Sequence, residues 1–138
     1  MDGPAPAGAG KVGTRGQGEP MKAGLADQTC VPCKGGVPPL TAAEIAPLLA
    51  QLDGWEVENE KRLLRTYRVK NFAEAITFAN RVGAIAEEQS HHPDLYVAWG
   101  RVRVEVWTHK IDGLTESDFV FAAKCDRAYA EDRTAETM

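Results

Sequence analysis

The chain has 138 residues, enough for one domain, of which 43% are hydrophobic, and it carries a formal net charge of −4. This acidic balance, without any cluster of Lys and Arg, argues against direct binding to nucleic acid, which depends on cations that neutralise phosphates. No apolar run approaches the roughly 20 residues that a membrane-spanning helix needs, and three cysteines are too few for a disulfide framework.

The N-terminal stretch of residues 1–20 is rich in Gly, Pro and Ala and has almost no large apolar side chain. Such a segment cannot bury enough surface to offset the entropy lost on ordering. We therefore predict a disordered or weakly ordered extension over residues 1–39, a folded domain over 40–132 and a short tail over 133–138. The start of the chain also lacks the basic region and apolar stretch of a secretory signal, so we expect a cytoplasmic location.

The first predicted helix lies in LTAAEIAPLLAQL, where Thr41 is followed three residues later by Glu44. This spacing is typical of a capping box, in which the side chain of each residue bonds to the backbone of the other. Two strand-like runs, at 55–58 and 63–69, follow and are separated by polar residues, which predicts a β-hairpin.

The second predicted helix begins after the cap residue Asn71 and ends at or just before the histidine pair 91–92, because Pro93 cannot continue a helix. Its predicted buried stripe consists of Phe72, Ile76, Ala79, Val82 and Ala86. Two further strands are expected at 95–99 and 101–109, where valines alternate with charged residues as in a sheet with one buried face.

A last helix is predicted after Thr115, with Asp118 as the capping-box partner three residues on. The resulting order is α-β-β-α-β-β-α, and both strand pairs are hairpins. We therefore predict an α+β fold with a four-stranded antiparallel sheet and helices packed on one face. The other face of the sheet must then meet solvent, a partner subunit or both.

All three histidines of the chain lie near the ends of these elements. Glu87 and His91 are four residues apart at the end of the second helix, so we expect them to share a face, with His92 pointing elsewhere. His109 ends the last strand, whose antiparallel return brings it back toward the start of its hairpin. Three imidazoles and one carboxylate are therefore expected to converge at one end of the sheet.

Three interpretations of this cluster are open on the residues alone. A histidine near a helix C-terminus can cap the last carbonyls. Three histidines and a carboxylate could bind zinc, although adjacent histidines in an extended segment point in opposite directions and rarely share an ion. Imidazole also suits proton transfer, since its reference pKa of about 6.5 lies near working pH, and this is the interpretation we favour.

Two of the cysteines, Cys30 and Cys33, have the spacing of half a zinc ribbon or of a redox pair. The second pair of a ribbon is missing, glycines and prolines follow in place of a helix, and Cys125 stands alone in the last predicted helix. We favour a structural or incidental role, with metal binding or redox chemistry as the alternative.

Five elements at fixed spacing carry a resemblance to a known family: Glu87, His91-His92-Pro93, Trp99, His109 and Asp118. With three, five, nine and eight residues between them, they resemble the signature of pterin-4a-carbinolamine dehydratases. The pairs Gly54-Trp55 and Thr108-His109 and the Gly-Leu-Thr run before the aspartate are similar to the same family, over about residues 40–129.

The resemblance implies a small lyase that dehydrates 4a-hydroxytetrahydropterin to quinonoid dihydropterin in tetrahydrobiopterin recycling, without metal or cofactor. It also implies a homodimer or homotetramer. The implied catalytic residues are His91, His92 and His109, and the implied substrate-binding residues are Glu87, Trp55, Thr108 and Asp118. Two imidazoles in different protonation states suit this dehydration, because one can deliver a proton while another withdraws one.

Several alternatives remain open. Trp55 and Trp99 suit core positions at the sheet edge, and Trp55 could instead form an apolar wall for the pterin. Asp118 could simply complete the helix cap, or could also orient His109 through the loop. The family includes members that stabilise dimers of a transcription factor, so a protein-interaction module is a second possible function. A metal-dependent hydrolase that uses the three histidines is a third.

Overall fold

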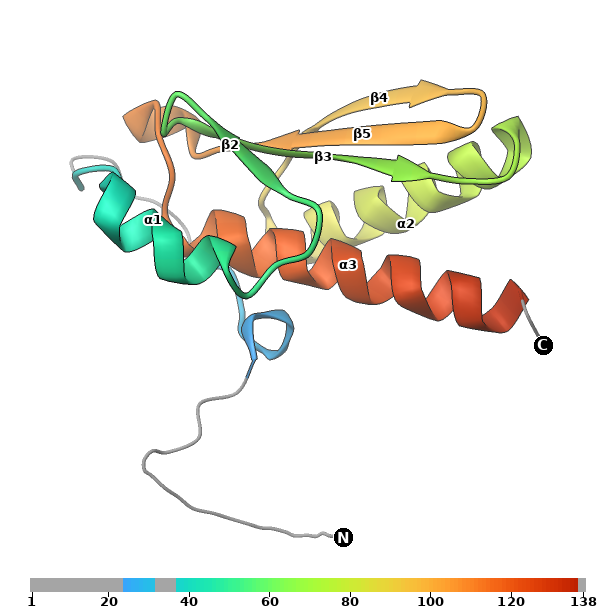
Figure 1. The fold of residues 1–138 in the computed structure, drawn as a ribbon, viewed down its shortest axis with the longest axis horizontal. Coiled ribbons are helices and arrows are strands. Elements are labelled where there is room, and N and C mark those ends of the chain that lie inside the picture. Colours follow the sequence, from blue (N-terminus) through green and yellow to red (C-terminus); the bar gives the residue numbers. More distant parts are fainter. Residues whose placement is uncertain (1–23, 32–36, 137–138) are drawn as a thin grey trace, which may run out of the picture.

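The computed structural model describes residues 24–31 and 37–136 (Figure 1). Its elements, in chain order, are η1 (Leu25–Asp27), α1 (Ala42–Leu49), β2 (Glu56–Glu58), β3 (Arg62–Arg68), α2 (Phe72–Gln89), β4 (Asp94–Ala98), β5 (Arg101–Val106), η2 (His109–Ile111) and α3 (Glu116–Glu136). Apart from the two short 3-10 helices η1 and η2, this is the predicted order α-β-β-α-β-β-α, which is confirmed.

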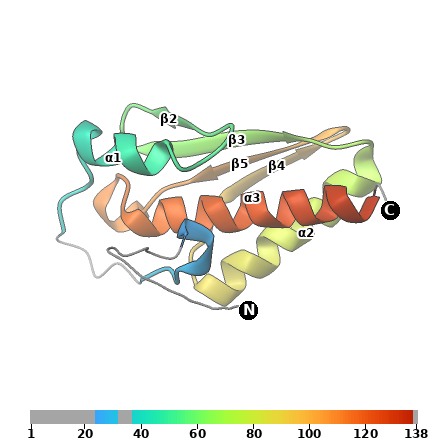
Figure 2. The same ribbon diagram turned by 60° about the horizontal axis from the view of Figure 1, so that its bottom comes forward.

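The four strands form one antiparallel sheet in the order β2-β3-β5-β4. Tyr67 of β3 lies opposite Val102 of β5, and Val102 in turn lies opposite Val97 of β4. Figures 1 and 2 show α2 and α3 on the same side of this sheet, with α3 running along its length. The predicted α+β architecture with helices on one face is therefore confirmed.

Local interactions explain where α1 and α2 begin and where α2 ends. Thr41 and Glu44 form the predicted capping box at α1, and the Asn71 side chain accepts from the Glu74 amide at the start of α2. At the far end of α2, Ser90 adopts a left-handed conformation with φ 52° and ψ 42°. The helix therefore stops directly before the histidine pair, as the sequence predicts.

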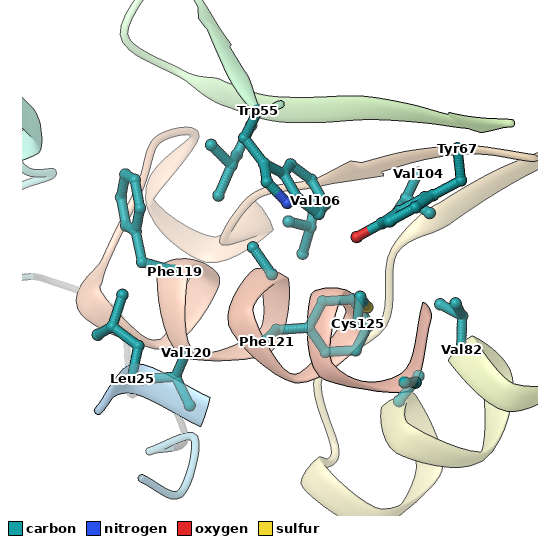
Figure 3. Close-up of a cluster of buried hydrophobic side chains, with 14 of the residues drawn as sticks. Leu25, Trp55, Tyr67, Val82, Val104, Val106, Phe119, Val120, Phe121 and Cys125 are labelled. Carbon is teal, nitrogen blue, oxygen red and sulfur yellow. The ribbon is translucent and has the colours of Figure 1, made fainter. Parts of the chain in front are cut away.

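The hydrophobic core fills the space between the sheet and the helices (Figure 3). Its fully buried members include Leu63 and Tyr67 from β3, Val102, Val104 and Val106 from β5, and Phe119, Phe121 and Cys125 from α3. Because side chains alternate along a strand, the three valines of β5 all face the helices, while Arg101 and Arg103 point to the open face.

The buried face of α2 includes the predicted Val82 and Ala86 but differs from the predicted stripe in the first half of the helix. Phe72 is 49% exposed and Ile76 is 41% exposed. The buried residues of α2 are Ala75, Phe78, Val82 and Ala86. Both sets follow helical spacing, and aromatic packing decides between them, since the Phe78 ring lies 4.7 Å from the Tyr67 ring and 5.5 Å from the Tyr129 ring between centroids.

The last strand is shorter than predicted. β5 ends at Val106, and His109 begins η2 instead of ending the strand, because an isolated bridge between Thr108 and Gly113 turns the chain tightly. Trp99 also differs from its predicted core position. Its side chain is 71% exposed, in the turn that joins β4 to β5.

Part of the predicted N-terminal extension packs against the domain. Leu25 and Cys30 are both buried, and α3 continues to Glu136, past the predicted boundary at 132. The disorder predicted for residues 1–20 lies outside the described residues, and the domain limits stay predictions. Within residues 24–31 and 37–136, no helix combines the length and the apolar character needed to cross a membrane.

Candidate active site

All three histidines line one pocket with a volume of about 350 Å³. The lining residues are Ser90, His91, His92, Trp107, Thr108, His109 and Lys110. They come from two connections that are distant in sequence, the one between α2 and β4 and the one between β5 and α3. The structure thus brings together the imidazoles that the sequence analysis expected to converge.

The end of α2 sets the direction of the first two histidines. Ser90 takes the left-handed conformation, and the His91 amide donates to the Ala86 carbonyl at 3.1 Å, which closes the helix end. The chain therefore leaves the helical path before His91, and Pro93 then keeps it extended. As a result, His91 does not continue the helix face that carries Glu87.

His91 pairs with a buried carboxylate. Its Nε2 lies 2.6 Å from Oδ1 of Asp118, whose side chain is fully buried, while the His91 side chain is 13% exposed. An ionised carboxylate only accepts hydrogen bonds, so His91 donates from Nε2 and, when neutral, keeps Nδ1 as an acceptor. The Asp118 side chain thereby fixes both the tautomer and the orientation of the imidazole.

Asp118 also serves as the helix cap that the sequence predicts. Its Oδ2 accepts from the Thr115 amide at 2.9 Å and from the Thr108 hydroxyl at 2.8 Å. The carboxylate therefore ties the start of α3 to the loop before His109 and, directly, to His91. The sequence analysis had considered an indirect link to His109, whereas the direct imidazole partner is His91.

His92 and Glu87 form a second, exposed pair. The His92 Nε2 lies 2.6 Å from Oε2 of Glu87, and the two side chains are 61% and 79% exposed. The expectation that Glu87 and His91 share a face, with His92 pointing elsewhere, is therefore wrong, because the left-handed Ser90 redirects the chain and His92 is the residue that meets Glu87. Glu87 holds a pocket residue without itself lining the pocket.

His109 is oriented by an aromatic neighbour. Its ring stacks on Trp107 with a centroid distance of 4.3 Å and an interplanar angle of 19°. The guanidinium carbon of Arg62 lies 4.6 Å from the centroid of the same indole. The sequence analysis missed Trp107 as a site residue, although strand alternation places it on the open face two residues before His109.

Trp55 lies in the core, away from the pocket lining. It is 6% exposed, and its indole N–H donates to Oδ1 of Asp126 at 2.9 Å, an oxygen that also accepts from Arg65 and Tyr67. Burial, together with the neighbouring Cys125 and Asp126, raises the pKa of the Tyr67 hydroxyl, which keeps it protonated as a donor. Of the two interpretations of Trp55, the structure supports the core residue.

The two described cysteines are buried thiols. The Cys30 Sγ donates to the Ser117 carbonyl at 3.5 Å, and burial raises the pKa of the Cys30 thiol to about 11. Burial likewise raises the pKa of Cys125. Cys33 lies outside the described residues. Among residues 24–31 and 37–136, no three His, Cys, Asp or Glu side chains are grouped so that they could hold a metal ion.

Comparisons with known proteins point to one family. The sequence profile of the family described as pterin 4 alpha carbinolamine dehydratase matches residues 38–128. A Rubrobacter xylanophilus protein, provisionally named pterin-4-alpha-carbinolamine dehydratase, is 63% identical over 103 residues, which cover 75% of this chain and 96% of that protein. A Rickettsia bellii protein with the same provisional name is 52% identical over 103 residues, covering 74% and 91% of the two chains.

Among solved structures, the fold is similar to that of the transcriptional coactivator/pterin dehydratase from Brucella melitensis, with a TM-score of 0.62 and 35% sequence identity. The match covers 67% of this chain and 98% of that one.

Proposed function

Because the chain belongs to the pterin-4-alpha-carbinolamine dehydratase family, we propose that it dehydrates 4a-hydroxytetrahydropterin to quinonoid dihydropterin by histidine acid–base catalysis. The observation that carries the proposal is the meeting of His91, His92 and His109 in one pocket. The histidines that resemble the family signature are thus the ones that share a cavity.

The reaction requires two proton movements. The C4a–O bond breaks, the hydroxyl takes up a proton and leaves as water, N5 gives up its proton, and a C4a–N5 double bond forms. His91 suits the base, because Nε2 is bound to Asp118 and Nδ1 remains to accept the N5 proton. The carboxylate then stabilises the imidazolium that results, as a buried aspartate does in other acid–base pairs.

The other two histidines suit the leaving group. His92 and His109 line the same pocket, so either can donate a proton or a hydrogen bond to the departing hydroxyl. Glu87 holds His92 through a 2.6 Å contact and, as a carboxylate, can accept from the amino and ring N–H groups of a pterin. Trp107 offers an aromatic surface beside the pocket against which a bicyclic ring can pack.

A homodimer or homotetramer is the assembly that we propose. Tyr96 is 53% exposed on β4, which forms one edge of the sheet, and Phe72 and Ile76 are exposed on α2. Phe72 and Ile76 are four residues apart and so share one face of α2, and apolar side chains gathered on one face are typical of surfaces that become covered. Light scattering coupled to size-exclusion chromatography gives the mass in solution, and a monomer at micromolar concentration contradicts this part of the proposal.

A protein-interaction function is the second candidate. The solved Brucella melitensis relative is titled both a transcriptional coactivator and a pterin dehydratase, and the exposed Phe72 and Ile76 offer an apolar helix face. This face lies on α2. Turnover in a purified, partner-free preparation separates the enzyme from a pure interaction module.

The test is a direct assay on freshly generated 4a-hydroxytetrahydropterin, followed by ultraviolet absorbance with and without a chelator. We expect dehydration faster than the uncatalysed rate, unchanged by the chelator, because imidazoles alone move the protons. No acceleration by the purified protein contradicts the proposal. Loss of activity with the chelator, restored by zinc, favours the metal-dependent alternative.

A further inference from the structure

A short segment before the family-matched region lies along α3. We call residues 24–31 the N-terminal strap, and the family profile begins only at residue 38. Figures 1 and 2 show its helical turn η1 against α3, on the side of that helix away from the sheet. Figure 3 shows Leu25 of the strap beside Val120 of α3, and both side chains belong to the buried core.

The first part of the strap is held to the middle of α3. The Lys124 ammonium donates to the Ala26 carbonyl at 2.9 Å, and Arg127 pairs with Asp27 at 2.6 Å. The residues of α3 that meet the strap include Ser117, Val120, Lys124 and Arg127. Successive members of this set are three, four and three positions apart, so they form one face of the helix. The strap therefore follows α3 back toward its N-terminus.

The last part of the strap reaches two elements at once. The Cys30 amide donates to Oε1 of Gln89 at 2.9 Å, at the end of α2. The Val31 amide donates to the Ser117 hydroxyl at 2.7 Å. The same hydroxyl donates to the Val31 carbonyl at 3.2 Å. Cys30 itself is buried, so the strap is packed into the junction of α2 and α3.

Gln89 and Ser117, the two anchors of the strap near the pocket, lie close in sequence to His91 and Asp118. Gln89 lies two residues before His91, and Ser117 directly precedes Asp118. The strap thus bridges the same two elements, the end of α2 and the start of α3, that the His91–Asp118 hydrogen bond joins. A change in the separation of these elements changes the geometry of that bond.

We propose that the N-terminal strap is a positioning element that holds His91 against Asp118 through Gln89 and Ser117. The inference rests on the proposed dehydratase function only for its kinetic consequence. Misplacing a catalytic group by about 1 Å can lower a rate by roughly 100-fold, so loss of two anchors is expected to act mainly on kcat. Neither Gln89 nor Ser117 lines the pocket, so KM should change little.

The test compares full-length variants, each of which removes the contacts of a different part of the strap. Ser117→Ala combined with Gln89→Leu removes both anchors near the pocket. Arg127→Ala is the matched control, because it releases the strap from α3 at the far end, through an exposed ion pair. Gln89→Glu is the conservative variant, because it keeps a side-chain oxygen that can accept from the Cys30 amide.

We expect the double variant to lose kcat by about fivefold to tenfold with KM within about twofold, and the control and Gln89→Glu to stay within about twofold of the wild type. A second readout is the NMR signal of the His91 Nε2 proton, which should broaden through faster exchange in the double variant alone. This signal needs no turnover, so it tests the strap even if the wild type proves not to be a dehydratase.

Hydrogen exchange first shows whether the strap is released, because its amides then exchange freely with deuterium. If the strap is released in the double variant but the His91 proton signal and kcat are unchanged, the inference is overturned. Equal losses in the double variant and in Arg127→Ala overturn it as well, because they indicate general stabilisation by the strap in place of positioning.

Discussion

His91 and Asp118 are 27 positions apart in the chain, yet their Nε2 and Oδ1 atoms lie 2.6 Å apart beside the pocket. The carboxylate is fully buried and holds three donors at once, from His91, Thr108 and Thr115. A buried charge with this many partners fixes its neighbours in one arrangement, because releasing any donor leaves part of the charge unsatisfied. The pair therefore links the helix cap of α3 to the acid–base chemistry proposed for the pocket.

Replacing the carboxylate by an amide tests this link. In Asp118→Asn, the amide lacks the negative charge that stabilises an imidazolium and cannot accept on both sides. We expect kcat for pterin dehydration to fall by about 10- to 100-fold and the free energy of unfolding to fall by about 1–3 kcal/mol. Steady-state kinetics and urea denaturation measure the two effects. Asp94→Asn, at an exposed strand residue, is the control, and a normal kcat in Asp118→Asn contradicts the role given to the pair.

The stacking of Trp107 on His109 can be tested separately. In Trp107→Leu the imidazole loses its aromatic neighbour, a contact whose strength is about 0.5–1.5 kcal/mol beyond area burial. We expect kcat/KM to fall by about tenfold, with Trp107→Phe retaining most of the activity. Trp99→Leu should be silent, because that side chain is 71% exposed in the β4–β5 turn. Equal kinetics in Trp107→Leu and Trp99→Leu refute a positioning role for Trp107.

Glu87 is expected to affect binding more than stability. Its pair with His92 is largely exposed, and exposed ion pairs contribute little to folding. Glu87→Gln should therefore melt at the wild-type temperature but raise KM for the pterin several-fold, because the lost carboxylate both contacts the pocket residue His92 and is the proposed acceptor for the pterin N–H groups. Glu88→Gln, the neighbouring residue on α2, is the matched control. The anchor hypothesis does not survive if KM is the same in both variants.

The thiol of Cys30 should be slow to react at neutral pH. Burial raises its pKa to about 11 from an ordinary value of 9.0, so the reactive thiolate is scarce in the folded chain. Iodoacetamide labelling, located by peptide mass spectrometry, should be far slower at pH 8 in buffer than in urea. Comparable labelling rates in the two solvents contradict the burial of Cys30.

The same shift links Cys30 to stability at high pH. Because its folded pKa lies above its unfolded pKa, its contribution to stability is complete below about pH 9 and is lost as pH rises through about 11. Urea denaturation between these two pH values should therefore show a smaller decline in Cys30→Ala than in the wild type.

Much of the fold could be predicted because its signals are local. The Thr41–Glu44 and Asn71–Glu74 spacings define helix starts within four residues, and strand alternation shows which side of β5 is buried. The rotation of α2 could not be predicted in this way. Phe72 and Phe78 both fit a helical stripe, and only packing against residues of β3 and α3 selects the second.

The convergence of the histidines could also be predicted, but their partners could not. Placing Glu87 and His91 on one face assumed that the helical path continues to His91, and a single left-handed residue, Ser90, redirects the chain. The bond between His91 and Asp118 depends on the placement of α3, a tertiary fact with no sequence period. The N-terminal strap was missed for a related reason, since its few apolar side chains do not form a periodic pattern.

The most direct test of the proposed chemistry is the rate of 4a-hydroxytetrahydropterin dehydration by His91→Ala and His109→Ala, compared with the wild type and with Trp99→Leu. General acid–base groups typically contribute about 10²- to 10⁴-fold, so each histidine variant should lose at least about 100-fold in kcat while the tryptophan variant keeps its rate. Wild-type rates in both histidine variants would contradict the account, because the proposed base His91 and the pocket residue His109 would then both be dispensable for the reaction.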